Sequence, residues 1–153
     1  VMMDMRQHWH DYFLDMAEQV ATRSTCLRRK VGCVLVRDKR VVATGYNGAP
    51  SGAPHCDATG CLRQQMGIPS GQRLDICRAS HAEANAISQC ARHGVSTEGA
   101  TAYVTVTPCS ACAKLLVQAG VKCVVYRGAY PDDASADVFA QSGVLIVEWS
   151  TKG

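Results

Sequence analysis

The sequence lacks any long hydrophobic run. No apolar stretch approaches the ~18 residues that a membrane-spanning helix needs, so no membrane partner is expected. Residues 1–5 also lack a basic region followed by a long apolar stretch, and this predicts no secretory signal. The net charge is small too, at +3, with 16 Lys and Arg against 13 Asp and Glu. This balance does not indicate binding to polymeric nucleic acid, although a local basic cluster is compatible with a small phosphate ligand.

The composition predicts one globular unit. A length of 153 residues fits a single domain over residues 1–153, and a chain of this size buries about 70% of its unfolded surface. Hydrophobic residues make up 47% of the chain, charged residues make up 19%, and no repeat or low-complexity tract interrupts it. The nine cysteines would suggest disulfides in a secreted protein. Because their number is odd and no secretory signal is evident, we expect reduced thiols and metal ligands in a cytoplasmic protein.

Hydrophobic periodicity predicts helices that alternate with strands. The pattern favours helices at 7–23, 61–66, 81–93, 108–119 and 134–142, and strands at 31–36, 41–46, 101–105, 122–126 and 144–149. Ser80 is the expected N-cap of one helix and Thr107 that of another, with Pro108 at its first position. The first two strands form a hairpin, and strands separated by helices favour parallel pairing. The predicted fold class is therefore α/β, a three-layer α-β-α arrangement around a five-stranded mixed sheet.

Two short segments carry the chemistry of the chain: His81-Ala82-Glu83 and Pro108-Cys109-Ser110-Ala111-Cys112. One imidazole and two thiolates suit tetrahedral zinc, and three protein ligands leave its fourth position open for water, as in catalytic rather than structural sites. Both segments lie at predicted helix starts, where the partial positive charge favours thiolates. We therefore predict that His81, Cys109 and Cys112 bind a catalytic zinc ion.

Glu83 lies two residues from His81, so its carboxylate is near the metal without having to bind it. A carboxylate there accepts a proton from water and passes it to a substrate. The combination H-x-E with P-C-x-x-C is the signature of zinc nucleobase deaminases. A closed zinc site, or a coincidence of two unrelated segments, is the alternative interpretation.

The chain resembles the deoxycytidylate (dCMP) deaminases of the cytidine deaminase superfamily. The matching segments are 24–32 (STCLRRKVG), 45–52 (GYNGAPSG), 81–87 (HAEANAI) and 108–114 (PCSACAK), and the resemblance covers nearly the whole chain. The zinc motif specifies the superfamily, whereas the Gly-Tyr-Asn-Gly segment and Asn85 narrow it to the branch that acts on nucleotides. Cys33 stands where the family usually has alanine, and we interpret it as a packing change on a buried strand.

The resemblance implies a cytidine deaminase-like fold and zinc-dependent hydrolysis of dCMP to dUMP and ammonia, which feeds dTMP synthesis. It also implies a homohexamer that dCTP activates together with Mg²⁺ and that dTTP inhibits. An effector site would use the loop residues Gly48, Ala49, Pro50 and Gly52.

The substrate contacts are less sharply indicated. Asn47 resembles the family's sugar-contacting asparagine, and its alternative role is that of a turn residue before Gly48. The 5′-phosphate needs positive charge, and the candidate cations are Arg28, Arg29, Lys30 and Arg127. We favour Arg29 and Arg127. Because Arg127 follows Tyr126 at the carboxyl end of a predicted strand, where open α/β sheets bind ligands, Tyr126 is included in the predicted site.

The long Pro- and Gly-rich connection over residues 47–77 contains further cysteines. A loop of this length is usually functional, and a structural zinc would order it. Some phage members of the resembled family carry a second zinc in this region. We predict a closed second site formed by Cys26, Cys56, Cys61 and Cys77, with His55 as a substitute ligand. Isolated buried thiols are the alternative.

Three other functions remain open from the sequence. One is deamination of free nucleosides, riboflavin precursors or tRNA adenosine on the same scaffold, and the weak net charge argues against tRNA. Another is a competence-associated, deaminase-like protein. The last is a zinc-stabilised binding module without catalysis, against which the intact Glu83 and the missing fourth ligand both count.

Overall fold

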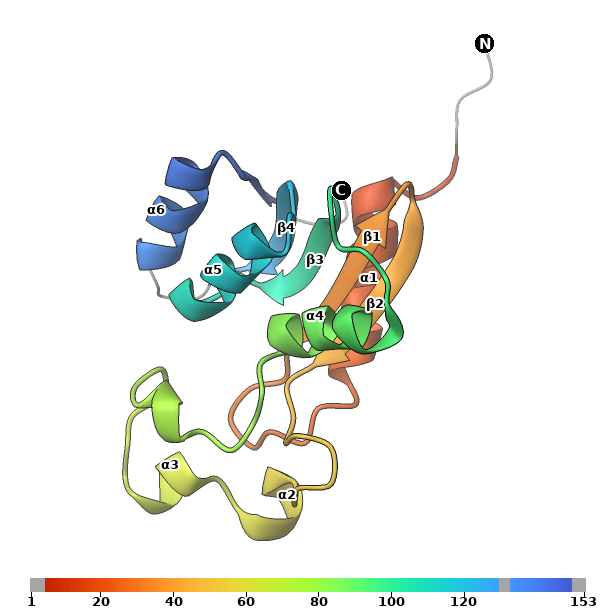
Figure 1. Ribbon diagram of the computed structural model, residues 1–153. Helices are drawn as coiled ribbons and strands as arrows, with labels where there is room; N and C mark the ends of the chain where they lie inside the picture. Colours follow the sequence, from red (N-terminus) through yellow and green to blue (C-terminus); the bar gives the residue numbers. More distant parts are fainter. Residues whose placement is uncertain (1–4, 130–132, 150–153) are drawn as a thin grey trace.

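The computed structural model describes residues 5–129 and 133–149, which include a central sheet of five strands (Figure 1). The strands are β1 (Gly32–Arg37), β2 (Arg40–Tyr46), β3 (Thr101–Val106), β4 (Cys123–Gly128) and β5 (Leu145–Glu148). They lie in the order β2-β1-β3-β4-β5. Strand β1 is antiparallel to both β2 and β3, whereas β3, β4 and β5 are mutually parallel. The predicted mixed sheet with an N-terminal hairpin is confirmed.

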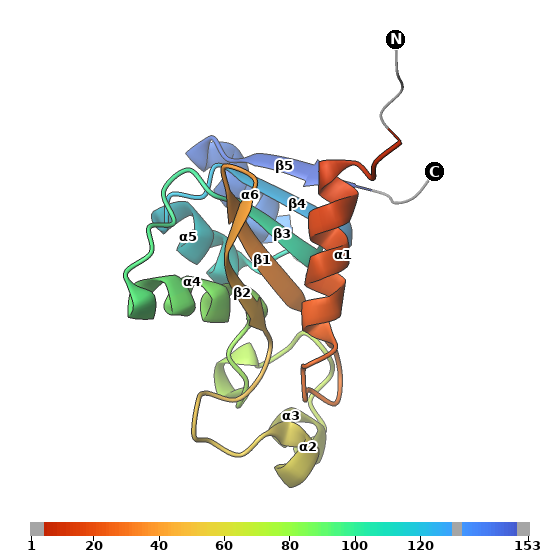
Figure 2. The ribbon, with the colours of Figure 1, turned by 90° about the vertical axis from the view of Figure 1, so that its right-hand side faces the viewer.

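Helices cover both faces of this sheet, as predicted for a three-layer fold (Figure 2). Helix α1 (Trp9–Ala21) packs on one face, and α4 (Ala82–His93), α5 (Ser110–Gln118) and α6 (Asp133–Ser142) pack on the other. No helix in the described ranges combines the length and apolarity needed to cross a membrane.

A hydrophobic core lies on each face of the sheet, and strand β1 contributes to both because its side chains alternate between the two faces. Cys33 and Leu35 face α4, whereas Val34 and Val36 face α1. All four are nearly inaccessible to solvent, with Cys33 at 0% exposure. The expected packing role of Cys33 on a buried strand agrees with this position. The sheet is therefore a rigid central layer from which the helix N-termini on the α4 side are positioned.

Two helix starts differ from the prediction by one or two residues. Helix α4 begins after His81 rather than Ser80, because the backbone of Ser80 pairs with Gly48 in an isolated bridge. Helix α5 begins after Cys109 rather than Thr107. The backbone N–H and the hydroxyl of Thr107 both donate to the carbonyl oxygen of Gly128, which keeps Thr107 attached to the end of β4. In both places a pairing partner distant in sequence overrides the local capping signal.

The connection between β2 and α4 projects beyond one end of the sheet (Figure 1). It contains the short helices α2 (Cys56–Thr59) and α3 (Leu62–Gln65) and one 3₁₀ turn, η1 (Leu74–Ile76). The expected helix at 61–66 is thus present in shortened form. The four residues of α2 are too few to generate a periodic signal, and the sequence did not predict it. The single-domain assignment over residues 1–153 stays a prediction, because both termini lie outside the described ranges.

Candidate functional site

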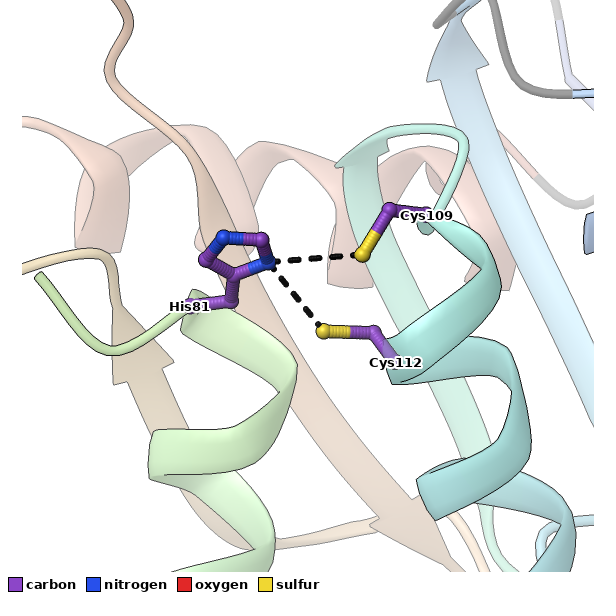
Figure 3. Close-up of side chains that lie close together, drawn as sticks. All are labelled: His81, Cys109 and Cys112. Atoms are coloured by element: carbon purple, nitrogen blue, oxygen red, sulfur yellow. Dashed lines mark hydrogen bonds between the residues drawn. The ribbon is translucent and has the colours of Figure 1, made fainter. Parts of the chain in front are cut away.

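Two adjacent helices carry the predicted zinc ligands at their N-termini (Figure 3). His81 is the N-cap residue of α4, Cys109 is the N-cap residue of α5, and Cys112 lies in the first turn of α5. Asn85 holds the start of α4 against the sheet, because its side-chain amide donates to the carbonyl oxygen of Tyr46 at 2.7 Å. The structure thus brings together three predicted ligands, the first and last of which are 31 residues apart in the chain.

The spacing of these three ligand atoms fits zinc. The Nδ1 atom of His81 lies 3.4 Å from the Sγ of Cys109 and 3.4 Å from the Sγ of Cys112. Zinc bonded to nitrogen at about 2.1 Å and to sulfur at about 2.3 Å in a tetrahedral arrangement sets such atoms about 3.5 Å apart. Among the described residues, no fourth His, Cys, Asp or Glu joins this group. The donor set therefore suits zinc and leaves one coordination position for a non-protein ligand.

Hydrogen bonds among the three side chains stabilise one of them, Cys109, as a thiolate. The pKa of Cys109 is lowered to about 4, chiefly by the hydrogen bond from the Cys112 thiol and further by His81. The pKa of Cys112 is raised, because that thiol gives its proton to the bond with Cys109. Hydrogen bonding with Cys109 raises the pKa of His81, while burial and the charge of Arg63 oppose the rise. Cys109 is therefore the thiolate of the group at neutral pH, whereas binding of zinc would release the proton of the Cys112 thiol.

Glu83 lies in the first turn of α4 and is almost completely buried, with 3% of its surface exposed. Burial raises the pKa of its carboxyl group to about 7. A carboxyl group with this pKa exchanges protons readily near neutral pH, as a general acid and base must. Glu83 lines the same cavity as His81 and Cys109, so its carboxyl group is placed to serve a substrate at the metal.

One cavity connects the metal ligands with a cluster of arginines. It is lined by Cys26, Arg28, Arg29, Val31, Asn47, Arg63, Ser70, Gly71, Leu74, Cys77, Ala79, His81, Ala82, Glu83, Val106, Thr107 and Cys109. Among these residues Glu83 is the single carboxylate, whereas three arginines supply positive charge. The cavity therefore combines one group that can transfer protons, Glu83, with three arginines that can bind an anion.

Asn47 lines this cavity and also orders its wall. Its side-chain oxygen accepts from the backbone N–H of Val31 at 2.8 Å, and its amide nitrogen donates to the carbonyl oxygen of Arg29 at 2.7 Å. Ser24 donates its hydroxyl hydrogen bond to the Asn47 carbonyl oxygen. The side chain of Asn47 thus fixes the segment that carries Arg28 and Arg29, and its predicted sugar contact stays a prediction.

The predicted phosphate residues separate into two locations. Arg29 is exposed at the cavity, whereas Arg127 and Tyr126 are not among the residues that line it. The guanidinium group of Arg127 forms ion pairs on the α1 side of the sheet, with partners Asp11 at 3.2 Å, Asp15 at 2.8 Å and Glu18 at 2.9 Å. This position does not support a role for Arg127 in phosphate binding. Its charge is instead neutralised where β4 passes α1.

Two other predicted groups lie in the long connection, apart from Cys26, which precedes β1. Cys26, Cys61 and Cys77 surround Cys56, whose pKa is raised first by burial and then by these neighbouring thiols. Among the described residues, only the group around His81 has three ligand atoms within 4.8 Å of one another, so the four cysteines are gathered without reaching ligand spacing. In the effector loop, Gly48 is buried by its bridge to Ser80, and Pro50 and Gly52 are exposed and outside the cavity.

Sequence reasoning missed Arg63. It follows Cys61-Leu62 in a Pro- and Gly-rich connection, where an arginine is ordinarily exposed. In the structure its residue surface is only 7% exposed, and it lines the cavity. No periodic pattern could have indicated this burial, because the segments that cover Arg63 are brought together by the tertiary fold.

The sheet topology and the His-Cys-Cys group with a buried glutamate define the class of zinc-binding proteins that share the cytidine deaminase fold. The family described as "Cytidine and deoxycytidylate deaminase zinc-binding region" matches residues 7–127. The chain belongs to this family.

Relatives and solved structures agree with this assignment. The chain is 41% identical to a deoxycytidylate deaminase of Schizosaccharomyces pombe over 94% of its own length, but it spans only 45% of that protein. It is 44% identical to ComE operon protein 2 of Bacillus subtilis, over 92% of this chain and 71% of that protein. A crystal structure of dCMP deaminase from the cyanophage S-TIM5, in complex with dCMP and dUMP, matches with a TM-score of 0.80 and 31% identity. That match covers 95% of this chain and all of the phage chain.

Proposed function

We propose that the protein catalyses the hydrolytic deamination of dCMP to dUMP and ammonia. The observation that carries the proposal is the single cavity in which the metal ligands and buried Glu83 share a wall with three arginines. A cytosine nucleotide has the matching layout, with an amine-bearing ring at one end and a phosphate at the other. The phage structure with bound dCMP and dUMP supports this choice of substrate over a free nucleoside.

The reaction balances as dCMP plus water giving dUMP plus ammonia. Bound at His81, Cys109 and Cys112, zinc would supply a water-derived nucleophile at neutral pH. Glu83 accepts a proton from that water and delivers it to the pyrimidine ring nitrogen. After the oxygen attacks the amine-bearing carbon, Glu83 carries a second proton to the departing amino group. Its pKa of about 7 suits both the acceptance and the release of protons.

The remaining cavity residues would bind and orient the nucleotide. Asn47 lines the cavity while it holds the 29–31 backbone, which supports a contact with the sugar, and Arg29 would contribute positive charge at the exposed side.

Turnover in ¹⁸O-labelled water tests the hydrolytic step directly. The dUMP formed should contain one ¹⁸O atom on the former amine-bearing carbon, with one ammonia released per dUMP, and removal of zinc by a chelator should stop both. Unlabelled dUMP, or unchanged turnover by metal-free protein, would refute the proposal.

The regulatory features are proposed with the function. They are activation by dCTP with Mg²⁺, inhibition by dTTP, an effector contact at Gly48, Ala49, Pro50 and Gly52, and assembly into a homohexamer. The exposed position of Pro50 and Gly52 outside the substrate cavity supports a separate effector contact. All nine cysteines are free, which suits the reducing conditions of the cytoplasm.

We also propose a structural zinc that draws Cys26, Cys56, Cys61 and Cys77 together. Their gathering around Cys56 supports this proposal, as does the small apolar content of the connection. His55, the substitute ligand, already pairs its Nδ1 with the Thr25 hydroxyl at 2.9 Å. Wild-type protein should contain two zinc equivalents and a Cys61→Ala variant only one. An unchanged metal content in that variant would exclude the assignment.

A further inference from the structure

Two arginines from different segments hold the same short stretch of the long connection. Arg28, which precedes β1, donates to the carbonyl oxygen of Ile68. Arg63, in α3, donates to the carbonyl oxygen of Gln72 at 3.0 Å. The stretch 68–72 between these two carbonyls includes Ser70 and Gly71, which line the cavity beside both arginines. The two guanidinium groups and this stretch therefore form one continuous part of the cavity wall.

Both guanidinium groups keep a buried N–H without a partner. Nη1 of Arg28 and Nε of Arg63 are shielded from solvent and form no hydrogen bond. Leaving a buried donor unsatisfied costs about 1–3 kcal/mol, and more when the group is charged. Arg63 as a whole is more than nine-tenths buried. Nε of Arg127 is likewise unpaired, but three carboxylates neutralise that guanidinium group. The side-chain hydrogen bonds of Arg28 and Arg63 among the described residues go instead to neutral carbonyl oxygens, so their charge has no acidic partner there.

An anion that accepts several hydrogen bonds would satisfy both guanidinium groups. Arginine donates only and stays charged, and its planar fork matches phosphate oxygens. The single carboxylate that lines the cavity is Glu83, which belongs to the metal end. The hydroxyl group of Ser70 adds a neutral donor on the same wall.

We propose that Arg63 and Arg28 form the 5′-phosphate subsite of the nucleotide cavity, closed on one side by the 68–72 stretch. This inference rests on the proposed function and deepens it, because it assigns the selection of nucleotide over nucleoside to two residues. Arg63 is the central residue, since it is the more deeply buried of the two. The carbonyl oxygens of Ile68 and Gln72 orient the guanidinium groups, and the phosphate would satisfy the donors that remain.

The test compares nucleotide with nucleoside in Arg63→Gln and Arg63→Lys variants of the zinc-loaded protein. In Arg63→Gln, kcat/KM for dCMP should fall about 30- to 100-fold, the loss expected for charge-assisted hydrogen bonds, while kcat/KM for deoxycytidine stays within about threefold. Arg63→Lys should recover part of the loss for dCMP. Arg73→Gln is the matched control, because Arg73 is exposed in the same connection and pairs only with Asp75 among its described contacts.

Equal losses for dCMP and deoxycytidine, or an unchanged value for dCMP, would overturn the assignment and leave Arg63 a purely structural residue. A second readout is independent of turnover: the Kd of dUMP should rise in Arg63→Gln and Arg28→Gln, while that of deoxyuridine should not. If wild-type protein binds dUMP through Arg63 but does not deaminate dCMP, the proposed function fails and the phosphate subsite stands. Should Arg63→Gln not fold, Arg63→Lys and Arg28→Gln supply the same comparison.

Discussion

At the scale of single residues, the account depends first on Glu83. Replacing it with glutamine keeps the shape of the side chain and removes its ability to accept a proton. We expect kcat of Glu83→Gln to fall by at least about 10²- to 10⁴-fold, the usual contribution of a general acid and base. Its zinc content, measured by elemental analysis, should stay that of the wild type, because Glu83 is not among the ligands. An active Glu83→Gln variant would show that another group moves the proton.

The ligand role of Cys109 gives a separate prediction. Cys109→Ser should lose the zinc ion bound with His81 and Cys112, and with it part of the folding free energy, because metal binding stabilises the folded chain. The matched control is Cys90→Ala, since Cys90 is equally buried but lies late in α4 among apolar side chains. Elemental analysis should find normal zinc in Cys90→Ala. Equal zinc loss in both variants would contradict a specific ligand role.

The residues that could be predicted are those whose chemistry is local in sequence. His81 and Glu83 are two positions apart, Cys109 and Cys112 are three apart, and each spacing restricts what the side chains can do. The environments of Arg63 and Arg127 could not be predicted, because their partners are set by the tertiary fold. Arg127 meets residues more than 100 positions away on α1, and nothing near it in the sequence indicates three carboxylates.

At the scale of secondary structure elements, the close approach of α4 to β2 positions His81 and Glu83 at the start of α4. A Cβ atom at Gly45 would overlap the carbonyl oxygen of Ala82 and lie 2.5 Å from the backbone nitrogen of Ala86. Gly45→Ala should therefore displace the start of α4, weaken zinc binding and reduce kcat at least tenfold. Zinc affinity from competition with a chromogenic chelator would measure the displacement.

The control for Gly45→Ala is Gly32→Ala on the opposite face. A Cβ atom at Gly32 would overlap backbone atoms of Ala17 in α1, which carries no metal ligand. This variant should lose stability in urea denaturation while its folded fraction keeps normal zinc affinity. If both substitutions weaken zinc binding equally, contact between α4 and β2 is not what sets the site.

The ion pairs of Arg127 join β4 to α1, and their loss should lower the free energy of unfolding. Arg127 and Asp11 are nearly buried, whereas Asp15 and Glu18 are partly exposed, so we expect Arg127→Met to cost about 2 kcal/mol of unfolding free energy. Urea denaturation checks the value, with the exposed Arg73–Asp75 pair as a control that should change little on Arg73→Gln. A selective loss of dCMP turnover in Arg127→Met would instead restore the predicted phosphate role.

The type of an element could be predicted where the hydrophobic pattern was long. The exact start of a helix could not be predicted where a segment distant in sequence bonds to the capping residue. The helix at 9–21 follows from regular apolar spacing, and the hairpin follows from two apolar, β-branched runs joined by the polar turn at residues 38–40. Ser80 and Thr107 both resemble N-caps, yet each forms backbone bonds with another segment, Gly48 for the former and Gly128 for the latter. With those bonds formed, His81 and Cys109 become the N-cap residues of α4 and α5.

At the scale of the whole molecule, the sheet order explains how distant segments form one cavity. Strand β1 lies between β2 and β3, and α4, which precedes β3, becomes a neighbour of α5, which follows β3, on one face of the sheet. The long connection then covers the end of the sheet with Arg63 and the 68–72 stretch. The zinc motif was therefore sufficient to predict the metal end, whereas the anion-binding end depends on how the connection folds back.

The most direct test of the account is the initial rate of ammonia release by zinc-loaded protein with dCMP and with deoxycytidine. We predict turnover of dCMP with a kcat/KM at least about 100-fold above that of deoxycytidine, because only the nucleotide has a phosphate for the proposed subsite at the arginine-lined end of the cavity. Faster turnover of deoxycytidine, or no turnover by protein with a full zinc complement, would contradict the proposal of a nucleotide deaminase.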